Sequence, residues 1–252
     1  NLNIYFLYLI LFFFGSILMR SAGCIVNDIL DKEFDKKVER TKNRPLASNK
    51  VSIKLAIIYV VILCSSAFLV LINFNKLTII LALGSMPLAF TYPLMKRFTY
   101  WPQLFLGITF NYGLILGWTS IMGQISMVPI IFYLGAIFWT LGFDTIYGFQ
   151  DIEDDEIIGI KSTSIKFKKN LNLFLIICYS LFIISIYIVG YFMNFSLIFY
   201  ISMIIGIFHL FFFQIYNLKY KNPESCFKVF KSNNMLGFLI LLNLLIGKIF
   251  TL

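Results

Sequence analysis

The chain has 252 residues, of which 60% are hydrophobic and only 13% are charged. A soluble domain carries roughly 45–50% apolar and about 25% charged residues. This composition therefore excludes a water-soluble globule, and its high hydrophobicity excludes disorder. The net charge of +9 fits basic loops that set membrane topology better than it fits nucleic-acid binding. We expect an all-α protein, a polytopic bundle of transmembrane helices.

Apolar runs long enough to cross a bilayer, which takes about 20 residues, follow one another along the chain. They lie at 4–26, 53–74, 77–95, 102–121, 127–150, 171–193, 195–217 and 234–251. This spacing predicts eight spans in a single domain over residues 1–252. Two of the connecting loops are long and polar, at 27–52 and 151–170, and both fall on the same side of the membrane.

Charge is distributed unevenly between the two membrane sides. Of the 21 basic residues, all except Arg20, Lys76 and Lys248 fall on the side of the two long loops. The positive-inside rule makes this side cytoplasmic, or the matrix side in a mitochondrion. All 12 acidic residues fall on this side or at the helix ends beside it, although acids contribute little to orientation. We therefore expect a reaction site at this membrane face.

Two acidic rows stand at the ends of the first and fifth spans. The first row shares one face of a helix with about 100° between residues and comprises Asn27, Asp28, Asp31 and Asp35. The second is predicted to form a narrow stripe on one helix, with Tyr147 beside it, and comprises Asp144, Asp151 and Asp155. Asp144 lies inside its apolar span, where acids are costly and usually functional.

Carboxylates stacked in this way repel one another, and the repulsion is stronger near a low-dielectric membrane than in water. Cations relieve it, and oxygen ligands of this kind suit Mg²⁺, whose coordination is often completed by substrate phosphates. Two acidic helices that face each other are thus expected to hold Mg²⁺ against a diphosphate. The alternative interpretation is that both rows are merely acidic helix ends in contact with water.

Basic residues near the two rows are candidate ligands of phosphate oxygens, for which Arg offers a bidentate fork and Lys a point charge. Lys32, Arg40 and Arg44 follow the first row, and Lys96 lies in the short loop after the third span. Lys161 follows the second row after a glycine turn. We interpret the remaining lysines of the first loop as charges that set topology.

The residues of both rows resemble the paired motifs of the UbiA superfamily of intramembrane prenyltransferases. The first motif reads Asn27-Asp28-x-x-Asp31-x-x-x-Asp35, followed by Arg40-Thr41-Lys42-Asn43-Arg44-Pro45-Leu46. The second reads Asp144-x-x-Tyr147-x-x-x-Asp151-x-x-Asp154-Asp155, followed by Gly159-Ile160-Lys161-Ser162-Thr163. Within the superfamily, residues 19–24, 92–97 and 226–237 resemble the 4-hydroxybenzoate polyprenyltransferases of ubiquinone synthesis.

This resemblance covers essentially the whole chain and implies a nine-helix fold whose central cavity opens to the cytoplasmic or matrix face. It implies that the Mg²⁺ and diphosphate residues are Asn27, Asp31, Asp35, Asp151 and Asp155, with Asp28 and Asp144 as supports. The catalytic candidates are Asp31, Asp144, Asp151, Tyr147 and Arg97. The resemblance places Arg97 near the aromatic acid and the diphosphate. Because the first motif ends the family's second helix but the first span here, we expect that the family's first helix is missing from this sequence.

The implied reaction is Mg²⁺-dependent transfer of a polyprenyl group from polyprenyl diphosphate to the ring carbon ortho to the hydroxyl of 4-hydroxybenzoate. It would take place in the bacterial or mitochondrial inner membrane, with lipid as the surroundings and no nucleic acid. An alternative within the superfamily is a haem farnesyltransferase or a menaquinone prenyltransferase. An alternative from another class is a cation transporter, which predicts a polar path to the opposite membrane side, yet no acidic residue falls there.

Overall fold

The structure is a computed structural model that describes residues 2–249, and the described chain is helical with no strand. The long helices that form the bundle are α1 (Leu2–Asp35), α2 (Ile53–Leu71), α3 (Lys76–Thr91), α7 (Met127–Gly148), α10 (Leu171–Phe192), α11 (Leu197–Phe208) and α12 (Pro223–Ile249). The shorter elements are η1 (Tyr92–Leu94), α4 (Met95–Phe98), α5 (Pro102–Phe110), α6 (Gly113–Met122), α8 (Ile152–Ile158), α9 (Thr163–Lys166) and η2 (His209–Tyr216), a π-helix.

Eight helical segments of the described chain are long and apolar enough to cross a membrane, which confirms the predicted all-α membrane bundle. Helix α1 continues beyond its apolar run to Asp35, as the shared helical face of the first acidic row predicts, whereas the predicted start of the last helix is wrong, since α12 begins at Pro223 rather than at 234. Apolar runs mark only the part of a helix that lies in hydrocarbon. Both helices continue beyond that part into polar sequence, so the apolar pattern underestimates their length.

The fourth span is interrupted between α5 and α6. Asn111 ends α5 and ties the interruption to α7, because its Nδ2 donates to Thr140 Oγ1 at 2.8 Å and to the Ala136 carbonyl oxygen at 3.2 Å. Asn75 similarly caps α3 while its Nδ2 donates to the Thr119 carbonyl oxygen of α6 at 2.8 Å. Inside a membrane, backbone N–H and C=O groups must find their hydrogen-bond partners within the protein. The side chains of Asn111 and Asn75 bond to main-chain groups at these two places.

The best-buried part of the bundle is formed by α7, α10, α12 and η2, where Tyr179, Phe182 and Leu236 are fully buried. A polar network crosses this core. Tyr179 Oη donates to Gln214 Oε1 at 2.6 Å, and Gln214 Nε2 donates to Asn233 Oδ1 at 2.9 Å. Asn233 Oδ1 also accepts from Trp139 Nε1 at 2.8 Å, so the network fixes α12 against α7.

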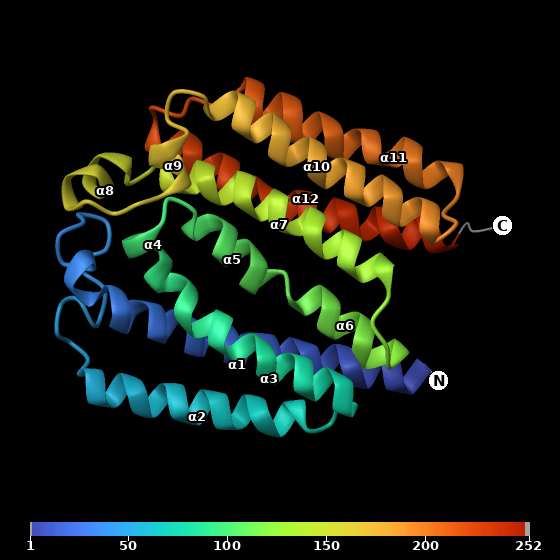
Figure 1. The fold of residues 1–252 in the computed structure, drawn as a ribbon, viewed down its shortest axis with the longest axis horizontal. Coiled ribbons are helices and arrows are strands. Elements are labelled where there is room, and N and C mark those ends of the chain that lie inside the picture. The colour runs from blue at the N-terminus through green and yellow to red at the C-terminus, as the bar shows by residue number, and fades with distance from the viewer. Residues whose placement is uncertain (1, 250–252) are drawn as a thin grey trace.

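The long helices lie side by side, and the connections that follow α1 and α7 meet at one end of the bundle (Figure 1). The short helices α4, α8 and α9 lie at this same end, which is the end of the two acidic rows (Figure 1). The fold thus brings together two segments that are more than a hundred residues apart in the chain.

Candidate active site

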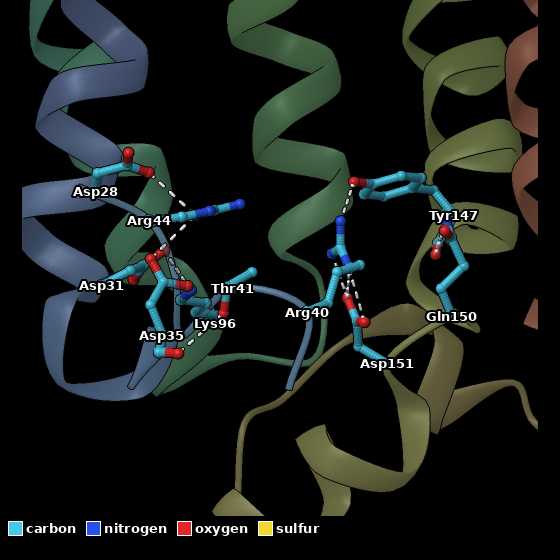
Figure 2. Close-up of polar contacts among 10 residues, drawn as sticks. All are labelled: Asp28, Asp31, Asp35, Arg40, Thr41, Arg44, Lys96, Tyr147, Gln150 and Asp151. Atoms are coloured by element: carbon cyan, nitrogen blue, oxygen red, sulfur yellow. Dashed lines mark hydrogen bonds and ion pairs between the residues drawn. The ribbon is translucent and has the colours of Figure 1, made fainter. Parts of the chain in front are cut away.

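The first acidic row stands on the unbroken last turns of α1, and its carboxylates are paired with basic residues. Arg44 Nη1 lies 3.0 Å from both Asp28 Oδ1 and Asp35 Oδ2. Lys96, on α4, places its Nζ 2.5 Å from Asp31 Oδ2, as Figure 2 shows. Asp31 and Asp35 are 3% and 7% exposed, so these pairs relieve a repulsion that water screens poorly.

The second acidic row does not form a stripe on a single helix, and the prediction of one is wrong. Helix α7 ends at Gly148, and Asp151 lies at the start of the separate helix α8. At the end of α7, Ser164 Oγ donates to the Thr145 carbonyl oxygen at 2.7 Å, and the Phe149 N–H bonds to the Ile146 carbonyl oxygen. The last turn of α7 thus closes with a hydrogen bond between residues three apart, and the chain turns before α8 begins.

Arg40 connects the two rows across a separation of 111 residues. Its Nε lies 2.9 Å from Asp151 Oδ1, its Nη2 also bonds to the Asp151 carboxylate, and its Nη1 donates to Tyr147 Oη at 2.7 Å (Figure 2). The hydrogen bonds to Asp151 raise the pKa of Arg40 above its usual value. A bidentate interaction between a guanidinium group and a carboxylate is strong and geometrically specific. Arg40 therefore fixes Asp151 and Tyr147 relative to the first row.

Both rows line one cavity of about 320 Å³ at this end of the bundle. Of the fourteen residues predicted for the site, the eleven that line the cavity are Asn27, Asp31, Asp35, Arg40, Arg44, Lys96, Asp144, Tyr147, Asp151, Asp155 and Lys161. The structure therefore brings the acidic rows and four of the predicted cations to a single space.

Three predicted residues are not among those that line the cavity. Asp28 contributes indirectly, since it shares Arg44 with Asp35. Arg97 turns toward α1, where its Nη2 donates to the Leu30 carbonyl oxygen at 2.5 Å and its guanidinium lies over the ring of Phe34. Lys32 is half-buried on α1.

Several polar residues that line the cavity were missed at the sequence level, including Thr41, Tyr92 and Gln103. Thr41 is buried and its Oγ1 donates to the Asp35 carbonyl oxygen at 3.1 Å. Gln103 stands in the first turn of an apolar span. A polar side chain in such a span needs a partner or a function, and that signal was available from the sequence.

The donor set of this cavity fits a divalent metal ion bound with a diphosphate. Asp31 Oδ1 is buried and has no hydrogen-bond partner in the described part of the chain, although a buried acceptor without a partner is unfavourable. Among the described residues, no three acidic, histidine or cysteine side chains converge closely enough to hold a metal ion by themselves. Mg²⁺ usually takes only one or two carboxylates and completes its shell with water and phosphate, so separated carboxylates around one space match its needs.

Asp155 differs electrostatically from the acids that have basic partners. Burial, together with repulsion from Asp151, raises the pKa of Asp155 to about 6. No cation pairs with it within residues 2–249. It therefore takes up a proton at mildly acidic pH unless a cation is bound nearby.

These features define an integral membrane protein with a charged cavity at one end of a helical bundle. The sequence matches the UbiA prenyltransferase family over residues 2–242. The chain belongs to this family.

Individual relatives are similar over almost the whole chain. The mitochondrial 4-hydroxybenzoate polyprenyltransferase of Drosophila melanogaster is 40% identical over 94% of this chain and 60% of its own length. The corresponding protein of Rattus norvegicus is 39% identical over 95% of this chain and 64% of its own length. The 4-hydroxybenzoate octaprenyltransferase of Coxiella burnetii strain CbuK_Q154 is 36% identical, with 94% of this chain and 82% of the relative aligned. The chain thus spans less than two thirds of these mitochondrial relatives.

Solved structures share the fold. A UbiA homolog from Aeropyrum pernix K1 superimposes with a TM-score of 0.76 over 93% of this chain and 89% of that one, at 22% sequence identity. A UbiA homolog from Archaeoglobus fulgidus, solved bound to GPP and Mg²⁺, gives a TM-score of 0.67 over 94% of this chain and 86% of that one, at 18% identity. These two likenesses concern the architecture of the bundle.

Proposed function

We propose that this protein transfers a polyprenyl group from a polyprenyl diphosphate to 4-hydroxybenzoate, in the synthesis of ubiquinone. The acceptor atom is the ring carbon ortho to the hydroxyl, and Mg²⁺ is the cofactor. The observation that carries the proposal is the meeting of both acidic rows with Arg40, Arg44, Lys96 and Lys161 in one cavity. The names of the relatives that align over most of this chain support the choice of substrates.

The acids of the two rows are the groups that would hold the metal. Asp31 and Asp151 stand on opposite sides of the cavity (Figure 2), with Asn27, Asp35 and Asp155 beside them. When bound, Mg²⁺ neutralises charge on the departing diphosphate. Asp28 and Asp144 are assigned supporting roles, the first through Arg44.

The cations of the cavity bind and orient the diphosphate. Arg40 and Arg44 offer planar forks to phosphate oxygens, and Lys96 and Lys161 offer point charges. As the allylic carbon–oxygen bond breaks, its electron pair leaves with the diphosphate, and these groups stabilise the developing negative charge. The ring carbon then forms the new carbon–carbon bond and loses its proton, which restores aromaticity.

The apolar lining of the cavity keeps water away from the electron-deficient prenyl carbon. Phe34, Val38 and Leu106 line the same space as the charged groups. Excluding water prevents hydrolysis of a reactive intermediate and strengthens the electrostatic interactions inside. The polyprenyl tail remains in the surrounding hydrocarbon, because transfer into water is unfavourable by about 0.8 kcal/mol per CH₂ group.

The proposed membrane is the bacterial inner membrane or the mitochondrial inner membrane, with the cavity at the cytoplasmic or matrix face. The basic loops of the acidic end support this orientation. A substituted-cysteine experiment at Asn49 and Gln124, on opposite sides of the predicted topology, tests it. Labelling of the Asn49 position from the outside of intact cells would contradict the orientation.

The direct test measures transfer of radiolabelled polyprenyl diphosphate in membranes of cells that express the protein. We expect product from 4-hydroxybenzoate that requires Mg²⁺ and disappears with EDTA. Haem and 1,4-dihydroxy-2-naphthoate serve as competing acceptors. Product from haem or the naphthoate alone would show a different acceptor, whereas cation flux in liposomes without any transfer would overturn the enzymatic proposal.

A further inference from the structure

Gln103 is a buried amide whose orientation is fixed by the main chain. It stands next to Pro102 in the first turn of α5, is 7% exposed and lines the cavity. Its Oε1 accepts a hydrogen bond from the Thr163 N–H at 3.0 Å. A main-chain N–H can only donate, so the bonded atom is the oxygen, and the other end of the amide is the NH₂ group.

The segment that holds this amide is itself firmly packed against α7. Thr163 and Ser164 are fully buried, and Thr163 Oγ1 lies 2.6 Å from Thr145 Oγ1. Gly148 allows the close approach, because a Cβ atom there would lie 2.4 Å from Ser164 Oγ and 3.6 Å from Gln103 Nε2. Three elements, α5, α7 and α9, therefore hold the Gln103 side chain in place.

Gln103 Nε2 has no hydrogen-bond partner among residues 2–249, since the contact with Thr163 is the only hydrogen bond of this side chain. This atom is not one of the fully buried polar atoms without a partner, so the NH₂ group is open to the cavity that Gln103 lines, where a bound acceptor can reach it. The amide lies beside Gly148, at the end of α7 where Lys161, Asp151 and Arg40 also line the cavity. Asp144, one helical turn earlier on α7, lies deeper in its apolar span.

We propose that Gln103 is a ligand-binding residue whose Nε2 donates a hydrogen bond to an oxygen of the prenyl donor's diphosphate. This inference rests on the proposed function and deepens it. The diphosphate is the ligand that suits this position, because the charged groups that bind phosphate gather at the same end of the cavity. A neutral donor adds directional hydrogen bonding there without adding a further positive charge.

The substitution Gln103→Glu isolates the proposed donor. Glutamate has nearly the same shape and keeps an oxygen for the Thr163 N–H, but it replaces the NH₂ group with a second carboxylate oxygen. Binding of inorganic pyrophosphate in the presence of Mg²⁺ is measured by calorimetry on the purified protein in detergent. We expect the affinity to fall at least about tenfold, because a hydrogen bond to a charged group is lost. The KM for the prenyl diphosphate should rise equally, and the KM for 4-hydroxybenzoate should not change.

Gln150→Glu is the matched control. It makes the same change of charge near the same end of α7, but Gln150 does not line the cavity and its Nε2 donates to the Tyr147 carbonyl oxygen at 3.0 Å. We expect this variant to bind pyrophosphate like the unmodified protein. Equal weakening in both variants would mean a general effect of charge and would overturn the proposal, as would a Gln103→Glu variant that binds pyrophosphate normally.

A second measurement detects the contact directly in the unmodified protein, and the two variants then assign it to a residue. Solid-state NMR of protein with ¹⁵N-labelled glutamine side chains and bound pyrophosphate detects short ¹⁵N–³¹P distances. We expect one such coupling, retained in Gln150→Glu and lost in Gln103→Glu. Absence of any coupling while pyrophosphate is bound would refute the role of Gln103 but leave the proposed function standing. Failure of the unmodified protein to bind Mg²⁺ and pyrophosphate would refute the proposed function.

Discussion

The two acidic rows reach the same cavity from differently built supports. The first stands on the single helix α1, and Asp28, Asp31 and Asp35 all have basic partners. The second is divided between α7, a turn and α8, and Asp151 is its one member with an ion pair in the described chain. A continuous helix fixes its acids at set spacings, so their repulsion must be relieved by cations brought from elsewhere.

The difference shows how charge is balanced across the cavity. The connection between α1 and α2 supplies both Arg44, which pairs with the first row, and Arg40, which pairs with the second. One short segment therefore couples the two rows. The second row keeps carboxylates without a basic partner in the described chain, and burial together with repulsion from Asp151 raises the pKa of one of them, Asp155.

The largest expected effect comes from removing one charge in each row. Asp31→Asn and Asp151→Asn should each lower the rate of Mg²⁺-dependent prenyl transfer at least about 100-fold, the usual loss when one electrostatic contact to a transition state is removed. Membrane insertion should be intact in both, as judged by yield and by gel filtration in detergent. Near-normal transfer in either variant would count against the use of that row.

Gly148→Ala tests the close packing at the end of α7, next to the turn that divides the second row. The added Cβ would overlap Ser164 Oγ, and overpacking of this kind destabilises by about 1–3 kcal/mol. We expect a lower melting temperature in detergent, together with slower transfer. Gly23→Ala is the matched control on α1, since a Cβ there meets no atom within 4 Å. A melting temperature unchanged by Gly148→Ala would show that α7 does not need this close contact.

Replacing Arg40 or Arg44 by lysine tests separately the ion pairs that each arginine makes with its acidic row. Lysine keeps the charge but cannot form the fork that Arg40 makes with Asp151 and Tyr147. We expect Arg40→Lys to reduce the transfer rate by about tenfold. Arg44→Lys should have a smaller effect, since a single Nη1 atom makes both contacts with Asp28 and Asp35. The reverse order of the two effects would contradict the assignment of Arg40 as the residue that connects the rows.

The smallest expected effect is a dependence of Mg²⁺ use on pH. Because the pKa of Asp155 is raised to about 6, protons compete with the metal as pH falls through this value. The Mg²⁺ concentration that gives half-maximal transfer should rise between pH 7 and pH 5.5. Asp155→Asn should weaken Mg²⁺ use at pH 7 and flatten this dependence, and an equally steep dependence in the variant would assign it to another group.

Much of the site was predictable because its residues obey local rules. The face shared by Asn27, Asp31 and Asp35 follows from helical periodicity alone, and α1 presents these residues to the cavity as predicted. Lys161, singled out for its position after a glycine turn, lines the same cavity, and its role as a phosphate ligand stays a prediction. Arg97 shows the limit: a loop cation near the site could turn either way, and here it donates to the Leu30 carbonyl oxygen instead of lining the cavity.

The sequence by itself determined the all-α membrane architecture, the eight spans and the side on which the acids gather, because hydrophobicity and charge act locally along the chain. Tertiary structure alone decided the contact at the end of α7, where Ser164 Oγ donates to the Thr145 carbonyl oxygen. It also decided which acid each arginine meets and how the Gln103 amide is oriented. These features depend on partners that lie between 9 and 111 residues away, whose distances and directions are set by packing and leave no periodic pattern in the sequence.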